Sequence, residues 1–502
     1  MKKKELIIIL GSLLVVVLSV TLAYFTTEIF GTGKDISLDS ANLKITFASG
    51  GGNISSTNIE PGWSSGASTF TVKNESNDTY KYNIIIKDLV NTFVTKGFLL
   101  YKITSTDGGY NMGDFVDVPK STSATDTILA YSVEIAKGVT HTYTVEFKYL
   151  TSEEDQSDDM GRILSGTLYI EKGTDKPLTL AEKILENKTI VTTPRGGAYN
   201  TVFTTDTTGT LFQATESIAG AAAKTVYYFA GAPKDNWVKF ANFYWRIIRT
   251  NHDGSVKLLY AGTSPDTTSG YIGTSAFNSS YDSPKYVGYM YGTDGSLSES
   301  RTNENDSTIK TYIDNWYSTN LSSYTKYIST EAVYCNDRQL DSGQTWSTSS
   351  DFNYITYTRL DYDTDGAKAS PTYDCANSKD AFSGSNTEAK LTYPIGLMTA
   401  DEINIAGGLA FNNAPAYYYL NSAGGSVTGS TYWWSLSPLG WDGASSVWDV
   451  GGSADPGNLD NNTVDSEDGV RPAISLKTCA LWTSGNGAPE TPYEISTTSG
   501  CW

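Results

Sequence analysis

Strict alternation of side-chain character is the feature that most limits how the N-terminal third of this chain can fold. The run THTYTVEFKYL, residues 140–150, alternates over its whole length. Successive side chains of a β-strand point to opposite faces, so this run predicts a half-buried antiparallel strand. Its predicted inner face carries His141, Tyr143, Val145, Phe147 and Tyr149.

The same alternation recurs from about residue 36 to residue 172, with turn-rich spacers between the runs. It is clear in TYKYNIIIKDL and GRILSGTLYIEKG, and weaker runs lie near 36–48, 68–74, 97–103 and 127–136. About seven short strands in about 140 residues predict two packed sheets. We therefore expect an antiparallel β-sandwich domain over residues 26–173.

The segment NIEPGWSSGASTFTVKNESNDTYKYNIII, residues 58–86, resembles the camelysin and biofilm-matrix fibre-forming family. The likeness covers roughly residues 6–172. It implies a jelly-roll-like surface domain, which in some members assembles into fibres when one subunit lends a strand to the next. The metalloprotease activity assigned to camelysin-type members is not expected here. The sequence has no H-E-x-x-H motif, and His141 shares a strand face with apolar residues.

An uncharged run from Leu6 to Phe25 follows three lysines at the N-terminus. Twenty helical residues span about 30 Å, the thickness of a hydrocarbon core. Residues 1–25 therefore predict one hydrophobic helix that serves as a cleaved signal peptide or as a retained membrane anchor, and both alternatives stay open. In either case the rest of the chain is expected outside the cell, at the membrane face or secreted.

Charge and cysteine content agree with export. The net charge of −19 argues against nucleic acid as a partner, because phosphate binding needs clustered lysine and arginine. An even number of cysteines outside the cytosol predicts disulfides rather than a metal site. Proximity in sequence favours the pairs Cys335–Cys375 and Cys479–Cys501.

A short amphipathic helix, expected within residues 174–190, links the sandwich to a second domain over residues 191–502. That domain is predicted to be α+β, with an apolar hairpin in NWVKFANFYWRIIRTNHDGSVKLLYAG and a helix in STIKTYIDNWYSTNLSSYTKYI. Thr399 and Glu402 have the spacing of a capping box at the start of another helix. Asp401 and Glu402 are therefore interpreted as capping groups, not as a catalytic pair.

Four motifs occur in this order in the second domain: W-R-I-I, P-I-G-L-x-T-A-D-E, W-x-x-S-P and G-V-R-P-A. Over roughly residues 225–502 they resemble an uncharacterised C-terminal domain family of bacterial surface proteins. More distantly, the pattern is similar to the C-type-lectin-like fold. This resemblance implies that GVRPAISL is a closing strand, in which Arg471 is a structural donor and Pro472 marks the strand start.

The loops between Trp433 and Asp468 are expected to hold a glycan or a surface-protein ligand without catalysis. The predicted contacts are made by Trp441, Asp442, Trp448 and Asp449, with the indoles stacking on sugar faces. No cofactor is expected, although a Ca²⁺ ion bound by Asp460, Asn461, Asn462, Asp465 and Asp468 is an alternative. Two other functions stay open: a self-assembling matrix or fibre subunit, and an extracellular hydrolase that uses Asp442 and Asp449.

Overall fold

A computed structural model describes residues 26–29, 36–38, 43–47, 53–57, 59–153, 155–186, 188–195, 199–265, 267–360, 369–414 and 428–501. The chain divides into two compact units, Met1–Lys176 and Pro177–Trp502, and each is described by itself. The molecule is mostly β, as predicted. The hydrophobic helix expected within residues 1–25 lies outside the described residues. No helix in the described ranges combines the length and apolar character that a bilayer crossing requires.

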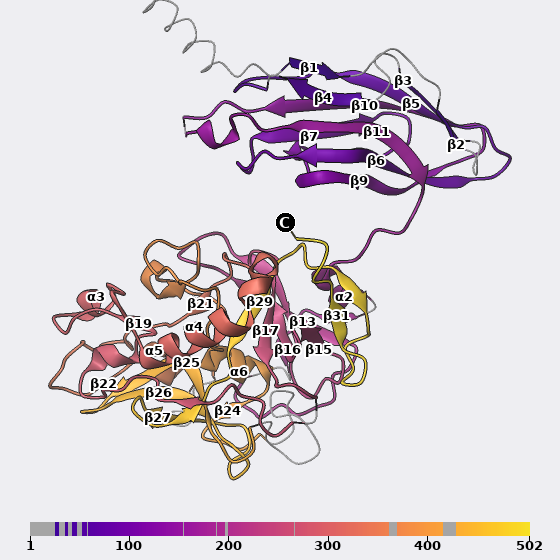
Figure 1. The fold of residues 1–502 in the computed structure, drawn as a ribbon. Coiled ribbons are helices and arrows are strands. Elements are labelled where there is room, and N and C mark those ends of the chain that lie inside the picture. Colours follow the sequence, from indigo (N-terminus) through magenta and orange to yellow (C-terminus); the bar gives the residue numbers. More distant parts are fainter. Residues whose placement is uncertain are drawn as a thin grey trace, which may run out of the picture. The chain divides into compact units, whose positions relative to one another are not determined.

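The first unit is a two-layer antiparallel sandwich, which confirms the prediction from alternation (Figure 1). One sheet has the order β1 (Thr26–Ile29), β4 (Asn53–Thr57), β11 (Leu164–Lys172), β6 (Tyr80–Asn91), β9 (Ser121–Ile135). The other has the order β2 (Ile36–Leu38), β3 (Leu43–Phe47), β5 (Ser68–Asn74), β10 (Thr140–Tyr149), β7 (Leu99–Ser105), β8 (Val116–Asp117). The sequence predicted about seven strands because the shortest ones, such as β1 and β8, carry too few residues to show alternation.

The sheets enclose an apolar core, and a row of hydrogen-bonded polar side chains crosses this core. The buried face of β10 is the alternate set that the sequence predicted. From that face His141 contacts the hydroxyl of Tyr82 on the opposite sheet, at 2.9 Å, and Tyr82 contacts the hydroxyl of Tyr143 at 2.5 Å. The amide of Tyr110 donates to the Tyr143 hydroxyl, so a continuous chain results if each tyrosine donates onward. His141 Nδ1 is then the final acceptor, which is the role of a packed core histidine.

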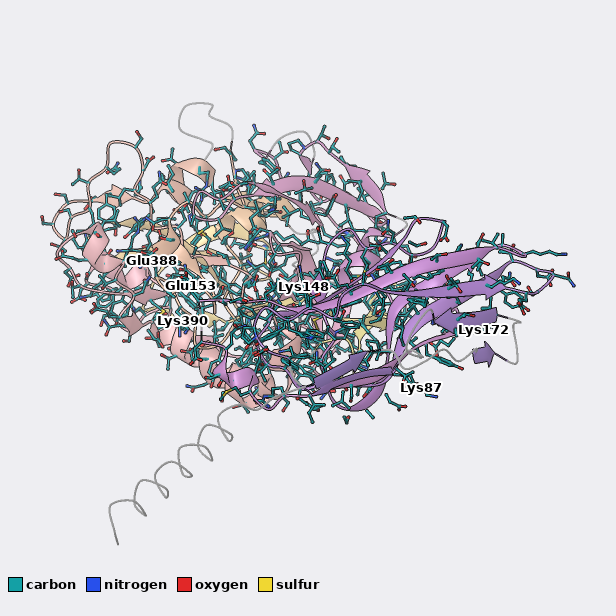
Figure 2. The ribbon with its side chains drawn as sticks, turned by 90° about the horizontal axis from the view of Figure 1, so that it is seen from above. Lys87, Lys148, Glu153, Lys172, Glu388 and Lys390 are labelled. Atoms are coloured by element: carbon teal, nitrogen blue, oxygen red, sulfur yellow. A yellow bond between two sulfur atoms is a disulfide. The ribbon has the colours of Figure 1, made fainter. Side chains whose placement is uncertain are left out.

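The chain enters and leaves the first sheet at opposite ends of the sandwich. Thr26 pairs with Thr57, and Leu164 at the start of β11 pairs with Asn91; we call this the proximal end. At the other end of β11, Lys172 pairs with Tyr82, and we call this the distal end. Figure 2 shows the labelled Lys172 toward the end of the sandwich away from Glu153. The nine residues of β11 separate the two ends by about 30 Å.

The second unit begins with a helix that the sequence assigned to a separate linker. Helix α2 (Leu180–Leu185) is capped by Thr179, and its Leu180 and Ile184 are buried in the core of this unit. The strand β12 (Thr189–Val191) already belongs to the main sheet. The segment 174–190 therefore contributes mostly to the second unit, because its apolar stripe has a core to cover.

Two mixed sheets and several short helices form the rest of this α+β unit. The larger sheet contains β12, β13 (Thr210–Glu216), β14 (Lys224–Tyr228), β15 (Trp237–Phe240), β16 (Phe243–Thr250), β17 (Val256–Tyr260), β29 (Ala473–Leu476), β30 (Trp482–Ser484) and β31 (Tyr493–Ile495). The smaller sheet contains β18 (Thr274–Ser275), β22 (Phe352–Asn353), β24 (Leu409–Ala410), β25 (Trp433–Trp441), β26 (Ser445–Val450), β27 (Asn458–Thr463) and β28 (Asp468–Gly469). Two-stranded ladders join β19 (Met290–Tyr291) to β20 (Asn305–Asp306) and β21 (Tyr334–Cys335) to β23 (Ala381–Phe382).

The helices of this unit are short, and several form where the sequence predicted them. The α-helices are α3 (Leu297–Ser300), α4 (Thr308–Asn320), α5 (Ile355–Leu360) and α6 (Ala400–Ala406). The 3-10 helices, one of them in the first unit, are η1 (Ser157–Asp159), η3 (Pro284–Val287), η4 (Ser322–Tyr327) and η5 (Ser378–Asp380). Helix α4 buries Ile309, Ile313 and Tyr317 along the predicted stripe. Helix α6 begins with the capping box of Thr399 and Glu402.

Both disulfides that sequence proximity favoured are present. Cys335 pairs with Cys375, and Cys479 pairs with Cys501, so all four cysteines of the chain are bonded. The first bridge links Cys335 of β21 to Cys375, whose backbone forms an isolated pairing with Ile218, just after β13. Two structural disulfides indicate an oxidising environment outside the cytosol.

Candidate functional site

The tryptophans that the sequence placed in a binding surface lie in the core. Trp441 is 5% exposed and Trp448 is fully buried, so the prediction that they stack on a ligand is wrong. Phe352 of β22 pairs alongside Trp441. Tyr357 of α5 and Phe411 cover the ring of Trp448. Segments far away in sequence therefore cover both indoles, although glycines flank Trp441 locally.

The two aspartates of the same prediction do not share a site. Asp442 is exposed in the turn after β25, whereas Asp449 is 1% exposed inside β26. Within the described residues, no donor reaches either carboxylate oxygen of Asp449. Burial, followed by the nearby carboxyls of Asp468 and Asp460, raises the pKa of Asp449 well above its ordinary value. We infer that Asp449 is protonated and hydrogen-bonds Asp468. Asp449 pairs with Trp434, whereas Asp442 follows Trp441 at the other end of β25, so the two carboxyls do not face a common substrate atom.

In the oxygen-rich segment that suggested a calcium site, several side chains form hydrogen bonds with one another. The side-chain amide of Asn462 donates to Asp468 at 3.3 Å, and the side-chain oxygen of Asn462, Oδ1, accepts from the Ser466 hydroxyl at 2.9 Å. Asn458 donates to Asp460 at 3.3 Å. Within the described ranges, no group of three or more His, Cys, Asp or Glu side chains has an arrangement that holds a metal ion.

The closing segment has the structural role that its sequence suggested. Strand β29 pairs with β17 in the large sheet. Just before it, the guanidinium of Arg471 is fully buried, donates to the carbonyl oxygen of Tyr260 at 3.1 and 3.2 Å, and lies over the ring of Trp433. Pro472 precedes the strand, where its missing N–H breaks no ladder bond.

A buried ionic network, which the sequence analysis missed, joins the large sheet to helix α6. Glu402 accepts from Lys257 Nζ at 2.7 and 3.0 Å and from Arg249 Nε at 2.9 Å. Arg249 also donates to Glu216 at 2.8 Å, and Glu216 accepts from His252 Nδ1 at 3.1 Å. A small cavity of about 20 Å³ lies among these groups, which is room for one water molecule.

The charges of this network balance one another. Burial raises the pKa of Glu402, but Lys257 and Arg249 outweigh that effect and hold the pKa below its ordinary value. Glu216 is also buried, and Arg249 and His252 lower its pKa to about 2. The cavity is too small for a substrate, so we interpret the network as a structural one. The available sequence signal was the occurrence of Arg249 and Lys257 inside otherwise apolar strands.

An open hollow of the second unit lies at the start of helix α4. It has a volume of about 430 Å³. The half-buried rings of Tyr291 and Tyr312 line it together with polar side chains from β18, β20 and α4. These polar side chains are Ser275, Asn278, Ser279, Asp306, Ser307, Thr308, Thr311 and Asn315. None of these residues was predicted, because the hollow is assembled from three separate segments.

Several groups in the hollow are held in place by the fold. The Tyr312 hydroxyl donates to the carbonyl oxygen of Ile272 at 3.2 Å. Asp306 accepts from the buried Lys310 Nζ at 3.1 Å with one of its oxygens, and its side chain is exposed. Thr311 and Asn315 lie one helical turn apart on α4 and are also exposed. The hollow therefore presents the fixed ring of Tyr312 beside exposed hydrogen-bonding groups.

A second hollow of about 280 Å³ lies beside the Cys335–Cys375 bridge and includes His252, Glu331 and several serines. His252 faces Glu216 with Nδ1, and burial, which lowers its pKa, is outweighed by Glu216, which raises it. The described contacts connect none of these serines to His252. We therefore treat this hollow as the edge of the ionic network and not as a catalytic site.

No family model, characterised protein or solved structure matches this chain. The family resemblances expected from its motifs thus remain predictions.

Proposed function

We propose that this chain is an exported cell-surface protein whose β-sandwich is a stalk and whose second unit is a non-catalytic ligand-binding domain. The proposed ligand is a glycan, held in the polar hollow at the start of α4. The observation that carries the proposal is the composition of that hollow, which combines Tyr291 and Tyr312 with carboxylate, amide and hydroxyl groups.

The chemistry of this hollow suits a sugar. Sugar rings present C–H faces that pack on aromatic rings and hydroxyls that need hydrogen-bond partners at their edges. Tyr291 and Tyr312 supply the rings, while Asp306, Thr311 and Asn315 supply acceptors and donors. No metal is required for this mode of binding. A lectin-like fold for the second unit fits this reading and remains part of the proposal.

The stalk role is supported by the path of the chain through the sandwich. The chain enters the first sheet at Thr26 and leaves it from Lys172, at opposite ends of β11. A domain built in this way adds about 30 Å between whatever precedes it and whatever follows it. If the hydrophobic run is retained as an anchor, that distance separates Lys172, where the chain leaves the sandwich, from Thr26, which follows the anchor.

Glycan binding is tested with the full chain on a glycan microarray, followed by calorimetric titration of the best ligand. We expect Asn315→Ala and Thr311→Ala each to weaken binding by about tenfold, since each removes one hydrogen-bonding group from an exposed position. Ser318→Ala, on the same helix but outside the hollow, is the matched control and should bind like the native protein. Absence of glycan binding, or equal affinity in all three variants, would refute the proposed site.

A structural subunit of an extracellular matrix or fibre is the second candidate. It is favoured by the position of β1, which is an edge strand of its sheet and, among the described residues, pairs with β4 alone. An edge strand leaves a row of backbone groups free to pair with another chain. Electron microscopy of the purified protein distinguishes the candidates: regular filaments support the matrix role, and dispersed particles support the binding role.

A further inference from the structure

Exposed apolar side chains gather at the proximal end of the sandwich. Val94 is 44% exposed, Leu150 36%, Met160 67% and Ile163 50%. We call these four residues the proximal tip. Isolated exposed apolar residues are common on any protein surface, but a cluster of them at one end of a domain marks a contact surface.

Hydrogen bonds hold the segments that carry the tip against one another. The amide of Thr92 donates to the carbonyl oxygen of Ile163, and the amide of Leu150 donates to that of Phe98. The loop before Met160 is fixed by Asp159, which accepts from the amide of Val94 at 2.6 Å and from the Tyr149 hydroxyl at 2.9 Å. The apolar side chains therefore project from a surface whose segments are held together by hydrogen bonds.

The start of β1 lies at the same end. Thr26 pairs with Thr57, and β4 pairs with β11 so that Ser55 is opposite Ser165. Because β4 and β11 are antiparallel, Thr57, two residues after Ser55, lies opposite Ile163, two residues before Ser165. The twenty-residue uncharged run ends at Phe25, one residue before Thr26. The apolar run thus joins the folded domain beside the tip.

We propose that the proximal tip rests on the lipid bilayer, with Met160 and Ile163 at the level of the headgroups, when the hydrophobic run is retained as an anchor. This inference depends on the anchored form of the proposed function. Four apolar side chains bind a membrane weakly by themselves, but a chain already tethered at Thr26 needs little added affinity to adopt one orientation. The contact would hold the stalk upright on the membrane.

The charges around the tip do not select a strongly charged partner. Lys96, Lys120 and Arg162 lie near it, and the stretch before Met160 carries Glu153, Glu154, Asp155, Asp158 and the buried Asp159. Both signs of charge therefore surround the tip, which favours a partner that accepts apolar side chains over one that carries a single sign of charge. A bilayer satisfies that condition, and a second copy of the tip is the rival occupant that the test below detects.

The test uses the full chain in vesicles of equal parts phosphatidylcholine and phosphatidylglycerol. A single cysteine is introduced by Met160→Cys and labelled with an environment-sensitive fluorophore; the four native cysteines are all paired and do not react. Val139→Cys is the matched control, because Val139 is an exposed apolar residue in the turn before Thr140, at the distal end of β10. Vesicles with and without quencher-labelled lipid are compared after flotation.

We expect lipid quencher to lower the fluorescence at position 160 by about twofold and to leave position 139 unchanged, since interfacial groups sit about 5–10 Å into the bilayer surface. Flotation with equal quenching at both positions would overturn the tip contact while leaving the anchor intact. A blue shift at position 160 that depends on protein concentration and not on quencher would assign the tip to a second copy and overturn the proposal. Failure of the chain to float would overturn the anchored form of the proposed function, and this inference with it.

Discussion

The two units of this protein differ in how many ionisable side chains they bury. Among the described sandwich residues, His141 and Asp159 are the buried side chains of the Asp, Glu, His, Lys and Arg types. The second unit buries many more: Arg195, Glu216, Asp235, Arg246, Arg249, Lys257, Arg301, Lys310, Arg338, Asp380, Asp401, Glu402, Asp449, Asp468 and Arg471. The sandwich is therefore stabilised mostly by apolar packing, whereas the second unit also depends on ionic pairs inside its core.

This contrast in buried charge bears on how each unit selects its topology. In the sandwich, alternating apolar faces need only another apolar face, so hydrophobic burial is sufficient. In the second unit, Arg249 and Glu402 are 153 residues apart in sequence and are both nearly inaccessible to water. An unpaired buried ion costs several kcal/mol, so such pairs penalise any arrangement that separates them.

Replacement of Glu402 should have the largest effect. Glu402→Ala leaves Lys257 and part of Arg249 unpaired in the core and should cost about 3–5 kcal/mol of unfolding free energy. Glu182→Ala is the matched control, because Glu182 has the same capping-box position in α2 but is exposed; it should cost about 1 kcal/mol or less. Urea denaturation measures both values. Equal losses in the two variants would show that the buried network adds no stability beyond capping.

Loss of the Cys335–Cys375 bridge should come next. The bridge closes a loop of 40 residues, for which chain entropy gives about 3–4 kcal/mol. We expect the double variant Cys335→Ser, Cys375→Ser to lower the thermal midpoint of the second unit only, because the sandwich contains no cysteine. Calorimetry of the full chain measures the two thermal midpoints when the two cores unfold in separate transitions. A matching fall in the sandwich transition would contradict the separation of the two units.

The Asp449 carboxyl should make the second unit sensitive to alkali. Its pKa is raised by burial and by Asp468 and Asp460, so the stabilising form is the protonated one. That contribution is complete at low pH and is lost as pH rises through the raised pKa. Thermal scans over roughly pH 5 to pH 9 should show a falling midpoint in the native protein and a flatter profile in Asp449→Asn. An unchanged slope in the variant would assign the dependence to another group.

His141 should give the smallest effect, with the opposite sign. Burial lowers the pKa of His141, and Asp107 opposes that shift only partly. The neutral ring is therefore the stabilising form, and its contribution is lost as pH falls through a pKa below about 6.5. The sandwich midpoint should fall on acidification, and less steeply in His141→Phe. If the midpoint falls equally steeply with pH in both proteins, carboxylates such as Asp159, and not His141, cause the acid sensitivity.

Some elements could be predicted because their signals are local. The alternation in β10, the apolar stripe of α4 and the capping box of Thr399 and Glu402 each depend on residues within a few positions of one another. The disulfide partners are close in sequence as well. The fold class followed from such local patterns, since the spacing of short strands is itself a local property.

The candidate site could not be predicted in the same way. Trp441 is flanked by Gly440 and by Asp442, which is the pattern of an exposed loop, yet β22 pairs alongside it. The hollow beside α4 collects Tyr291 and Tyr312 from segments whose sequences carry no shared motif. Exposure and cavity shape depend on which distant segments pack together, and no local pattern encodes that.

An antiparallel sandwich followed by an α+β unit with two cystines could be predicted from the sequence alone, because strand alternation, helix capping and cysteine spacing are set by neighbouring residues. The three-dimensional packing was needed to show which aromatic rings are accessible, where a hollow forms, and that Arg249, Lys257, Glu216 and Glu402 meet. Those outcomes depend on the packing of segments that lie from about thirty to more than a hundred and fifty residues apart, where burial of one group requires the arrival of another.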